Sequence, residues 1–226
     1  QVAEQVITEY PSYTVKKVMW DSFTRETSAT GNTYPDVTRI IKQQQQAGAL
    51  VMDYAGHGSE IQMSHEKVLR ITDFENFSNT NLPLWVTASC DIMPFDGGEA
   101  TIGETAMLNS KGGAVAFYGT TRTVYAAQNT VLNKNFMHYV LSYNDDGSPC
   151  TIGEAQRLAK NCSGNESIAH NTLQYSLLGD PALALLLPTA KVVVDEINGK
   201  ATGSDSGITL KAGSLTKVKG HIEGAD

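Results

Sequence analysis

Two short apolar segments, each of which runs into a reactive side chain, constrain the fold of this chain more than any other feature. Residues 49–54 lead into His57, which stands between two glycines, and residues 84–88 lead into Cys90. Each segment has the length and composition of a buried β-strand. Ligands and catalytic groups gather at the carboxyl ends of strands in open α/β sheets. Two neighbouring parallel strands would therefore bring His57 and Cys90 together at one edge of a sheet.

The rest of residues 1–188 predicts helices and strands in alternation. Pro35 favours the start of a helix over residues 36–46, which Gly48 ends. Residues 16–23 and 113–118 have the composition of further strands. Three Thr-x-x-Glu sequences predict helix N-termini with capping boxes, and they begin at Thr72, Thr101 and Thr151. Strands that alternate with helices indicate an α/β fold, in which helices cover both faces of a mostly parallel sheet.

The character of the sequence changes after Pro188. Residues 191–197, 207–210 and 215–222 alternate in polarity or favour β-branched side chains, and Asn198-Gly199 is a hairpin signal. We therefore expect an α/β unit over residues 1–188. Residues 189–226 are expected to start a small β domain of immunoglobulin-like type.

The composition argues against two classes of protein. The net charge is −7 and no cluster of Lys and Arg is present, whereas nucleic-acid binding needs concentrated positive charge. No apolar run approaches the roughly 20 residues that span a bilayer. The chain starts at Gln1 without a charged and apolar leader, so we expect it to be a piece of a longer protein.

Three cysteines make an odd count. Cys150 and Cys162 are close in sequence and would pair in an oxidising compartment, which leaves Cys90 free, as a catalytic thiol has to be. The alternative is that all three are unpaired and that Cys90 is a small buried apolar residue. A redox role has little support because the chain has no Cys-x-x-Cys pair.

A thiol beside a histidine is the reactive pair of cysteine peptidases and transpeptidases. His57 would accept the thiol proton or hold the thiolate of Cys90 as an ion pair. The backbone N–H groups of Gly58 and Cys90 are candidate donors to the oxyanion of the tetrahedral intermediate. Glycines on either side of His57 let the backbone bend sharply and approach a substrate. A histidine between glycines is also common in plain turns, so this motif alone is weak evidence.

Five motifs, in a fixed order along the chain, carry more information than any one of them. They are Asp53-Tyr-Ala-Gly-His57-Gly-Ser, Thr87-Ala-Ser-Cys90-Asp, Ile102-Gly-Glu104, Lys111-Gly-Gly-Ala-Val-Ala-Phe-Tyr-Gly-Thr-Thr and Leu177-Leu-Gly-Asp-Pro-Ala-Leu. Together they resemble the gingipain family of cysteine peptidases over residues 35–188. The resemblance implies a caspase-like α/β fold, a dyad of His57 and Cys90, and Gly58 as an oxyanion donor.

Shorter motifs point to a subgroup of that family. Phe95-Asp96, the run from Thr120 to Ala126, and Leu132-Asn133 are similar to the sortases, or C-terminal signal peptidases, of type IX secretion. This resemblance implies a peptidase or transpeptidase at the bacterial cell surface, associated with the outer membrane, which removes C-terminal export signals from secreted proteins. A lipopolysaccharide amine and other secretion components would be further partners. No cofactor is implied, with a structural calcium left open. The alternatives are a general gingipain-like endopeptidase and a non-catalytic caspase-like scaffold.

Two features depart from the secreted gingipains. Ala126 stands where they carry a tryptophan in the wall of the specificity pocket, so a pocket selective for Arg or Lys is not carried over. The family's carboxylate that orients the histidine comes from upstream, where Asp21 is the best candidate. Much of the family's upstream catalytic region is missing from this chain.

The remaining polar residues divide into substrate-binding candidates and structural ones. Thr120, Thr121, Arg122 and Tyr125 follow a predicted strand at the same sheet edge as the dyad. The guanidinium of Arg122 would either hold a substrate carboxylate or form a structural ion pair. Structural roles are expected for Glu104 and Glu154 in helix caps and for Asp91 and Asp180 in turns. No role is assigned to His65, His138, His170 and His221.

Overall fold

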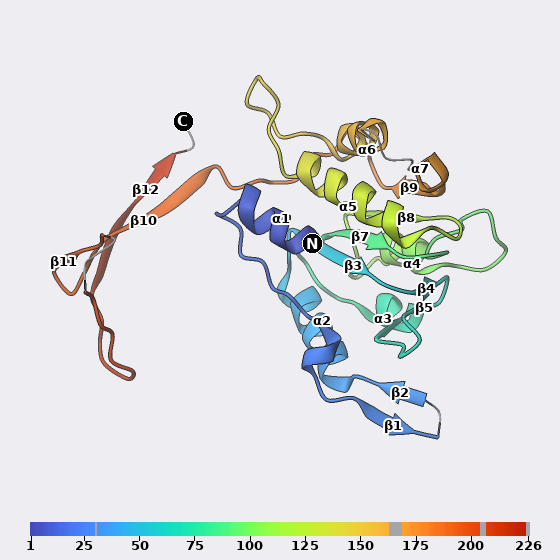
Figure 1. The fold of residues 1–226 in the computed structure, drawn as a ribbon, viewed down its shortest axis with the longest axis horizontal. Helices are drawn as coiled ribbons and strands as arrows, with labels where there is room; N and C mark the ends of the chain where they lie inside the picture. Colours follow the sequence, from blue (N-terminus) through green and yellow to red (C-terminus); the bar gives the residue numbers. More distant parts are fainter. Residues whose placement is uncertain (30, 163–168, 204–206, 225–226) are drawn as a thin grey trace. The chain divides into compact units, whose positions relative to one another are not determined.

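The structure is a computed structural model that describes residues 1–29, 31–162, 169–203 and 207–224. The chain forms two compact units, Gln1–Leu186 and Leu187–Asp226, and each is described on its own (Figure 1). Within the described residues, no helix is both long enough and apolar enough to cross a membrane.

A four-stranded sheet in the order β3-β7-β8-β9 forms the centre of the first unit. β3 (Val51–Ala55), β7 (Leu84–Ala88) and β8 (Ala116–Thr120) run parallel, and β9 (Tyr175–Leu178) is antiparallel to β8. Every residue of β7 and β8 is buried, whereas β3 lies at the edge of the sheet and is partly exposed. The mostly parallel sheet that the sequence predicts is confirmed.

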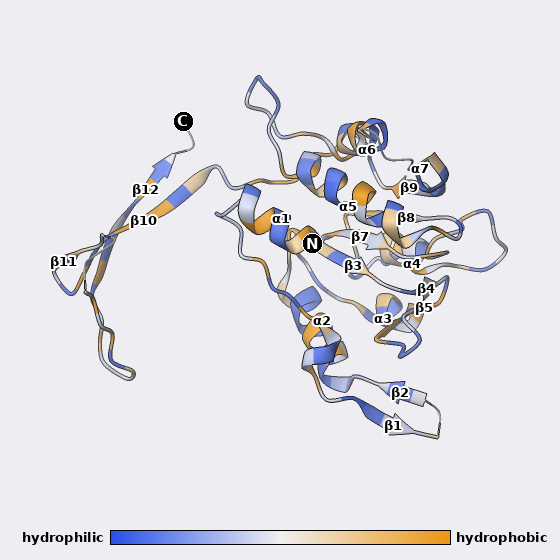
Figure 2. Ribbon diagram, viewed as in Figure 1, coloured by the Kyte–Doolittle hydropathy of each residue, from blue (hydrophilic) through white to orange (hydrophobic). Residues whose placement is uncertain are grey.

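Helices cover both faces of this sheet (Figure 1). α5 (Ala126–Val140) crosses one face, where Tyr118 of β8 stacks on Phe136 with ring centroids 4.0 Å apart. α2 (Pro35–Ala47), α3 (Ile71–Asn76) and α4 (Ile102–Leu108) belong to the opposite face, where Trp85 of β7 contacts Phe74 with centroids 5.3 Å apart. Figure 2 shows hydrophilic and hydrophobic residues alternating along α2, as in a helix with one face on the core.

The other elements of the first unit are short. They are α1 (Val2–Glu9), η1 (Trp20–Ser22), the hairpin of β1 (Glu26–Ser28) and β2 (Gly31–Thr33), the small antiparallel sheet of β4 (Gly58–Ser59), β5 (Gln62–Met63) and β6 (Leu69–Arg70), and the helices α6 (Ile152–Asn161) and α7 (Ala169–Gln174).

The predicted strand over residues 16–23 is wrong. Residues 14–19 have no regular secondary structure, and Trp20–Ser22 form η1. Val18 and Trp20 pack against the core, and the Trp20 ring stacks on Tyr54 of β3 at 6.0 Å. The apolar side chains of this segment therefore pack on the core although its backbone does not pair with a strand.

Helix starts follow the sequence signals at three of four places. α2 begins at Pro35 and ends before Gly48, as predicted. At α4, the Thr101 hydroxyl accepts from the Glu104 N–H and the Glu104 carboxylate accepts from the Thr101 N–H, so the capping box is confirmed. At α6, Thr151 caps the helix through its hydroxyl.

The capping box predicted at Thr72 is wrong. α3 starts at Ile71 directly after β6, with Arg70 as the N-cap residue. The carboxylate of Asp73 accepts from the Arg70 N–H at 2.8 Å, and Thr72 lies inside the first helical turn. The end of a strand therefore sets this boundary in place of a threonine hydroxyl.

The second unit is a three-stranded antiparallel sheet in the order β11-β10-β12. β10 (Ala190–Ile197) and β11 (Lys200–Ala201) are joined by Asn198 and Gly199, whose φ angles of 53° and 81° fit a tight hairpin turn, as predicted. β12 (Val218–Gly224) completes the sheet. The strand predicted over residues 207–210 is wrong, because these residues have no regular structure. The immunoglobulin-like character of this unit stays a prediction.

Candidate active site

Parallel pairing of β3 with β7 brings the two sequence motifs to one edge of the sheet. Ala55 and Ala88 are paired at the ends of these strands, and the Gly56 N–H donates to the Ala88 carbonyl at 3.2 Å. His57 and Cys90 each follow two residues after this last pair. Both residues therefore leave the sheet at the same edge and from adjacent strands, as the sequence predicts for a dyad.

The loops that carry His57 and Cys90 touch through Gly58 and Ser89. A methyl group added at Gly58 would lie 2.1 Å from Ser89 Oγ, so a larger residue would require the Ser89 hydroxyl or the loop to move. Ser89 is buried, and its Oγ has no hydrogen-bond partner within the described residues. The close approach holds the histidine loop against the residue that precedes Cys90.

The backbone of His57 is held, and its ring is exposed. The His57 carbonyl accepts from the Tyr54 hydroxyl at 2.6 Å and from the Ser64 N–H at 2.7 Å. A methyl group at Gly56 would lie 2.5 Å from the Tyr54 hydroxyl oxygen, so this glycine is needed for the bond. The His57 ring lies 5.0 Å from the ring of His65, measured between centroids. His65, for which the sequence predicts no role, is therefore a neighbour of the candidate base.

Cys90 is half-buried against the loop that follows β8. Its Sγ lies 3.5 Å from the Val124 nitrogen and 3.6 Å from the Val124 carbonyl oxygen. The next residue, Asp91, has a φ of 48°, and its carboxylate accepts from the Thr123 hydroxyl at 3.0 Å. The turn role expected for Asp91 is therefore the one seen.

All three cysteines are free, so the pairing predicted for Cys150 and Cys162 is wrong. Cys150 is buried and Cys162 is exposed at the end of α6. Burial raises the pKa of the Cys150 thiol above its ordinary value. Cys90 is thus one of three thiols, and its place at the strand edge distinguishes it from the others.

Residues 1–186 match the family described as Peptidase family C25. The chain belongs to peptidase family C25. Among solved structures, it is similar to gingipain R (RgpB), described as an Arg-specific cysteine proteinase, with 20% identity and a TM-score of 0.59 over 70% of this chain and 39% of that one. It is also similar to the complex of Porphyromonas gingivalis RgpB pro- and mature domains, with 18% identity and a TM-score of 0.59 over 70% and 40%.

The likeness at these identities concerns the fold. The gingipain-like α/β fold that the sequence predicts is confirmed, and the chain spans about two fifths of the length of the gingipain structures. A search of curated proteins finds no match.

In this C25 domain, Thr120 and Thr121 support the Cys90 loop. Thr120 is fully buried, and its hydroxyl donates to the Ser89 carbonyl. Thr121 is tied to the end of α7, because its N–H and its hydroxyl both donate to the Gln174 carbonyl, at 2.8 and 3.1 Å. The side chain of Thr120 is therefore unavailable to a substrate, which corrects its assignment as a substrate-binding group.

Arg122 and Tyr125 are the exposed members of the predicted substrate-binding set. Arg122 forms a two-point ion pair with Asp96, in which one N–O distance is 3.0 Å. Tyr125 is 60% exposed and packs its ring on His170, with centroids 4.8 Å apart. The alternative of a structural ion pair for Arg122 is thus the arrangement seen in this structure.

Within the described residues, no carboxylate forms a hydrogen bond or ion pair with the His57 ring. Asp21 lies in η1, and no hydrogen bond or ion pair joins it to His57 within the described residues. Asp53 of β3 is bonded instead to Asn133 of α5 at 2.9 Å. Although its residue surface is exposed at the open edge of β3, close packing on the α5 side raises the pKa of Asp53 to about 6.

The acidic side chains of the described residues serve structural roles. The part of the chain that the structure describes contains no group of three or more His, Cys, Asp or Glu side chains placed to hold a metal ion. Glu104 acts in its helix cap, and the Asp180 carboxylate accepts from the Ala182 N–H in a turn. The Glu154 carboxylate pairs with Arg157.

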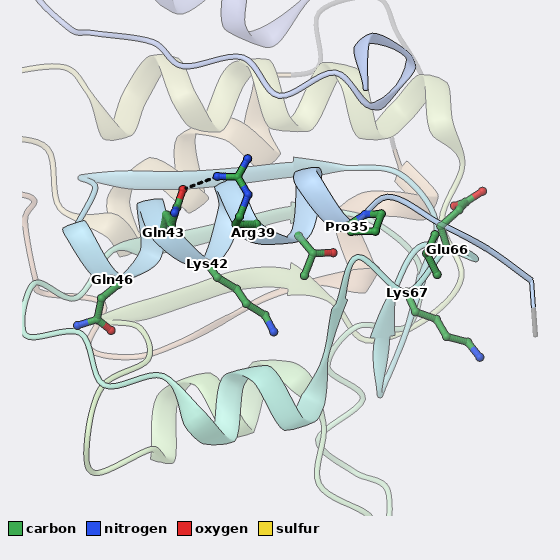
Figure 3. A pocket seen from close by; sticks show the side chains of 9 residues that line it. Pro35, Arg39, Lys42, Gln43, Gln46, Glu66 and Lys67 are labelled. Carbon is green, nitrogen blue, oxygen red and sulfur yellow. Dashed lines mark hydrogen bonds between the residues drawn. The ribbon is translucent and has the colours of Figure 1, made fainter. Parts of the chain in front are cut away.

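A shallow hollow of about 560 Å³ lies over α2 and the turn that follows β5 (Figure 3). Arg39, Lys42 and Lys67 give it three cations. Arg39 is paired with Asp36, and Lys42 is paired with Asp73. Because two of its three cations are already neutralised, the hollow has no built site for an anion.

Proposed function

We propose that this chain carries the reaction centre of a cysteine peptidase in which Cys90 is the nucleophile and His57 is the base. The observation that carries the proposal is the paired ending of β3 and β7, reinforced by the contact of Gly58 with Ser89. Membership of peptidase family C25 supports it.

In the proposed reaction His57 takes the proton of the Cys90 thiol, and the thiolate attacks the carbonyl carbon of a peptide bond. A sulfur–carbon bond forms, and the carbonyl electron pair moves to the oxygen. Collapse of this intermediate breaks the carbon–nitrogen bond, and His57 returns its proton to the departing amine. The acyl-enzyme is then resolved by water, which gives a peptidase, or by another amine, which gives a transpeptidase.

Two backbone N–H groups are proposed to stabilise the oxyanion, those of Gly58 and Cys90. The Ser64 N–H donates to the His57 carbonyl, and hydrogen-bonded pairs alternate with non-bonded pairs in an antiparallel ladder. The next pair, Gly58 with Met63, therefore leaves the Gly58 N–H outside the ladder. The Cys90 N–H has no hydrogen-bond partner within the described residues.

For specificity, we propose that Arg122 and Tyr125 present the exposed surface beside the dyad. Arg122 would hold a substrate carboxylate by exchanging its bond to Asp96. The arginine specificity of gingipain R is not proposed for this chain, because Ala126 replaces the tryptophan of the secreted gingipains. In line with the sequence resemblance, the proposed substrates are secreted proteins with a C-terminal export domain, and the accepting amine is on lipopolysaccharide at the cell surface.

The test compares the wild type with Cys90→Ala and His57→Ala on an intact secreted protein that carries an export domain. We expect cleavage by the wild type and loss of cleavage in both variants, with unchanged thermal unfolding. Cys162→Ser is the matched control, because it removes an exposed thiol outside the site and should keep full activity. Full function of Cys90→Ala would favour the non-catalytic scaffold.

A second assay separates the two kinds of enzyme. A sortase-type enzyme should ignore small basic peptides and should join the acyl group to an added primary amine, seen as a mass increase of the product. Rapid cleavage of small basic peptides without amine transfer would favour a general endopeptidase.

A further inference from the structure

The segment from Thr123 to Tyr125 lies between Cys90 and helix α7. Both polar groups of the Val124 backbone approach Cys90, with its nitrogen 3.5 Å and its oxygen 3.6 Å from Sγ. The N–H and the C=O of one residue point the same way only in an extended chain. Tyr125, with φ −92° and ψ 131°, continues this extended backbone. Residues 123–125 therefore form an extended segment, and the edge that carries the Val124 N–H and C=O faces the Cys90 thiol.

Helix α7 occupies the other edge of this segment. His170 Nε2 contacts the Thr123 carbonyl oxygen at 3.1 Å. The Asn171 side chain accepts from the Tyr125 N–H at 3.0 Å and donates to the Tyr125 carbonyl at 2.8 Å. These bonds satisfy backbone groups that point away from Cys90.

Each of these contacts fixes a peptide group that also faces the thiol. In a trans peptide the C=O and the N–H point in opposite directions, and no peptide bond in the described residues is cis. His170 holds the carbonyl of the Thr123–Val124 peptide, so the Val124 N–H of that peptide points to Cys90 Sγ. Asn171 holds the N–H of the next peptide, so the Val124 carbonyl faces the same sulfur.

Side-chain hydrogen bonds hold Asn171 of α7 in the core. Asn171 is fully buried and also donates to the Asn129 side chain of α5 at 2.8 Å. Asn129 accepts a second bond from the Tyr175 hydroxyl of β9 at 2.9 Å. His170 is exposed, and its ring lies on Tyr125. The buried asparagine thus anchors α7, and the exposed histidine completes the contact with the segment.

We infer that His170 is a positioning residue for the nucleophile: it orients the Val124 N–H so that this group donates to the Cys90 thiolate. The inference rests on the proposed function of Cys90. A donor held in place stabilises the thiolate more than the neutral thiol, because hydrogen bonds to charged groups are the stronger ones. His170 Nε2 is the donor in this contact, because the Thr123 carbonyl oxygen can only accept.

The test measures the rate of Cys90 alkylation by iodoacetamide from pH 5.5 to 9.5, with peptide mapping to separate Cys90 from the other two thiols. His170→Phe keeps a ring on Tyr125 but removes the donor. His170→Gln keeps a donor without the ring. We expect alkylation of Cys90 at pH 6.5 to be about three- to tenfold slower in His170→Phe and within about twofold of the wild type in His170→Gln. Two other titratable groups of this region, Asp91 and Tyr175, are the same in both variants, so a changed profile reports on His170.

A His170→Phe profile that overlays the wild-type profile would overturn the inference. Thermal unfolding of each variant checks that the fold is intact, and the exposure of His170 makes a folded product the expected result. His57→Ala, measured in the same way, separates this inference from the proposed dyad. If only His57→Ala changes the profile, the positioning role is wrong and the dyad stands. If only His170→Phe changes it, the dyad is wrong and the positioning role stands.

Discussion

At the scale of single residues, the candidate site depends on how closely two loops approach. A Cβ at Gly58 would clash with the Ser89 hydroxyl, and this contact lies between the two proposed catalytic residues. The short hydroxyl of Ser89 fills the space, although it has no hydrogen-bond partner within the described residues. The contact therefore provides proximity and contributes no polar bond.

Gly58→Ala tests this contact. The added methyl group would lie 2.1 Å from Ser89 Oγ and 3.2 Å from the nearest atom of Ile92, so the Ser89 hydroxyl must turn away and the loops must shift slightly. We expect a loss of about 1–3 kcal/mol in the free energy of unfolding, measured by urea denaturation, together with loss of activity.

Ser89→Ala is the matched partner of that variant, because it removes the clashing oxygen. Alone it should change stability little, since its hydroxyl is buried without a partner. In the double variant it should restore most of the lost stability. A double variant as unstable as Gly58→Ala would contradict the close contact.

Asp53 provides a prediction on pH. Close packing raises the pKa of Asp53 to about 6 from its ordinary 3.8, so the folded state holds the proton more tightly than the unfolded state. The stability that this contributes is complete below about pH 4 and is lost as the pH rises through 6. Asp53→Asn keeps the acceptor for Asn133 and removes the charge.

The melting temperature of Asp53→Asn, relative to the wild type, should therefore rise between pH 4 and pH 7. Because the residue surface is exposed, water screens the charge and we expect a difference of only a few degrees. A difference in melting temperature that stays constant or falls over this range would show that the pKa of the Asp53 carboxyl group is not raised.

At the scale of elements, the helix starts distinguish a sequence signal from the structure that uses it. Thr101 and Thr72 both begin a Thr-x-x-Glu sequence, yet only Thr101 caps a helix. Thr72 lies inside α3 because β6 ends at Arg70 and the helix follows at once. A local motif cannot reveal where the preceding strand stops, since this depends on its pairing with a distant segment.

Thr101→Ala should destabilise the protein by about 1 kcal/mol in urea denaturation, because the first turn of α4 loses its cap. Thr72→Ala is the control, and it should be neutral or slightly stabilising, because alanine has the higher helix propensity. Equal losses in the two variants would contradict the different roles of these threonines.

At the scale of the whole molecule, the parts of the candidate site that local sequence patterns mark were predictable. His57 and Cys90 each follow the end of a strand by two residues, so the strand-end motifs indicated the site. The holding contacts of the site were not predictable. His170 contacts the segment beside Cys90 through the Thr123 carbonyl, from a helix 47 residues further along the chain, and no local pattern marks it.

The two-unit organisation predicts how the chain tolerates shortening. Leu185, near the end of the first unit, is buried, while β10 begins only at Ala190. A chain that ends after Pro188 should keep the melting temperature of the first unit within about 2 °C. A chain that ends after Ala184 loses the buried Leu185 and should melt more than 5 °C lower, since a buried leucine contributes about 2–5 kcal/mol. Equal melting temperatures for the two shortened chains would contradict this boundary.

The central claim is that His57 activates Cys90, and a mechanism-based probe tests it most directly. A peptidyl acyloxymethyl ketone is incubated with the protein, and the modified residue is mapped by mass spectrometry. We predict one adduct, on Cys90, which is absent from His57→Ala. An adduct that falls on exposed Cys162 as readily as on Cys90, or one on Cys90 that survives the loss of His57, would contradict the account.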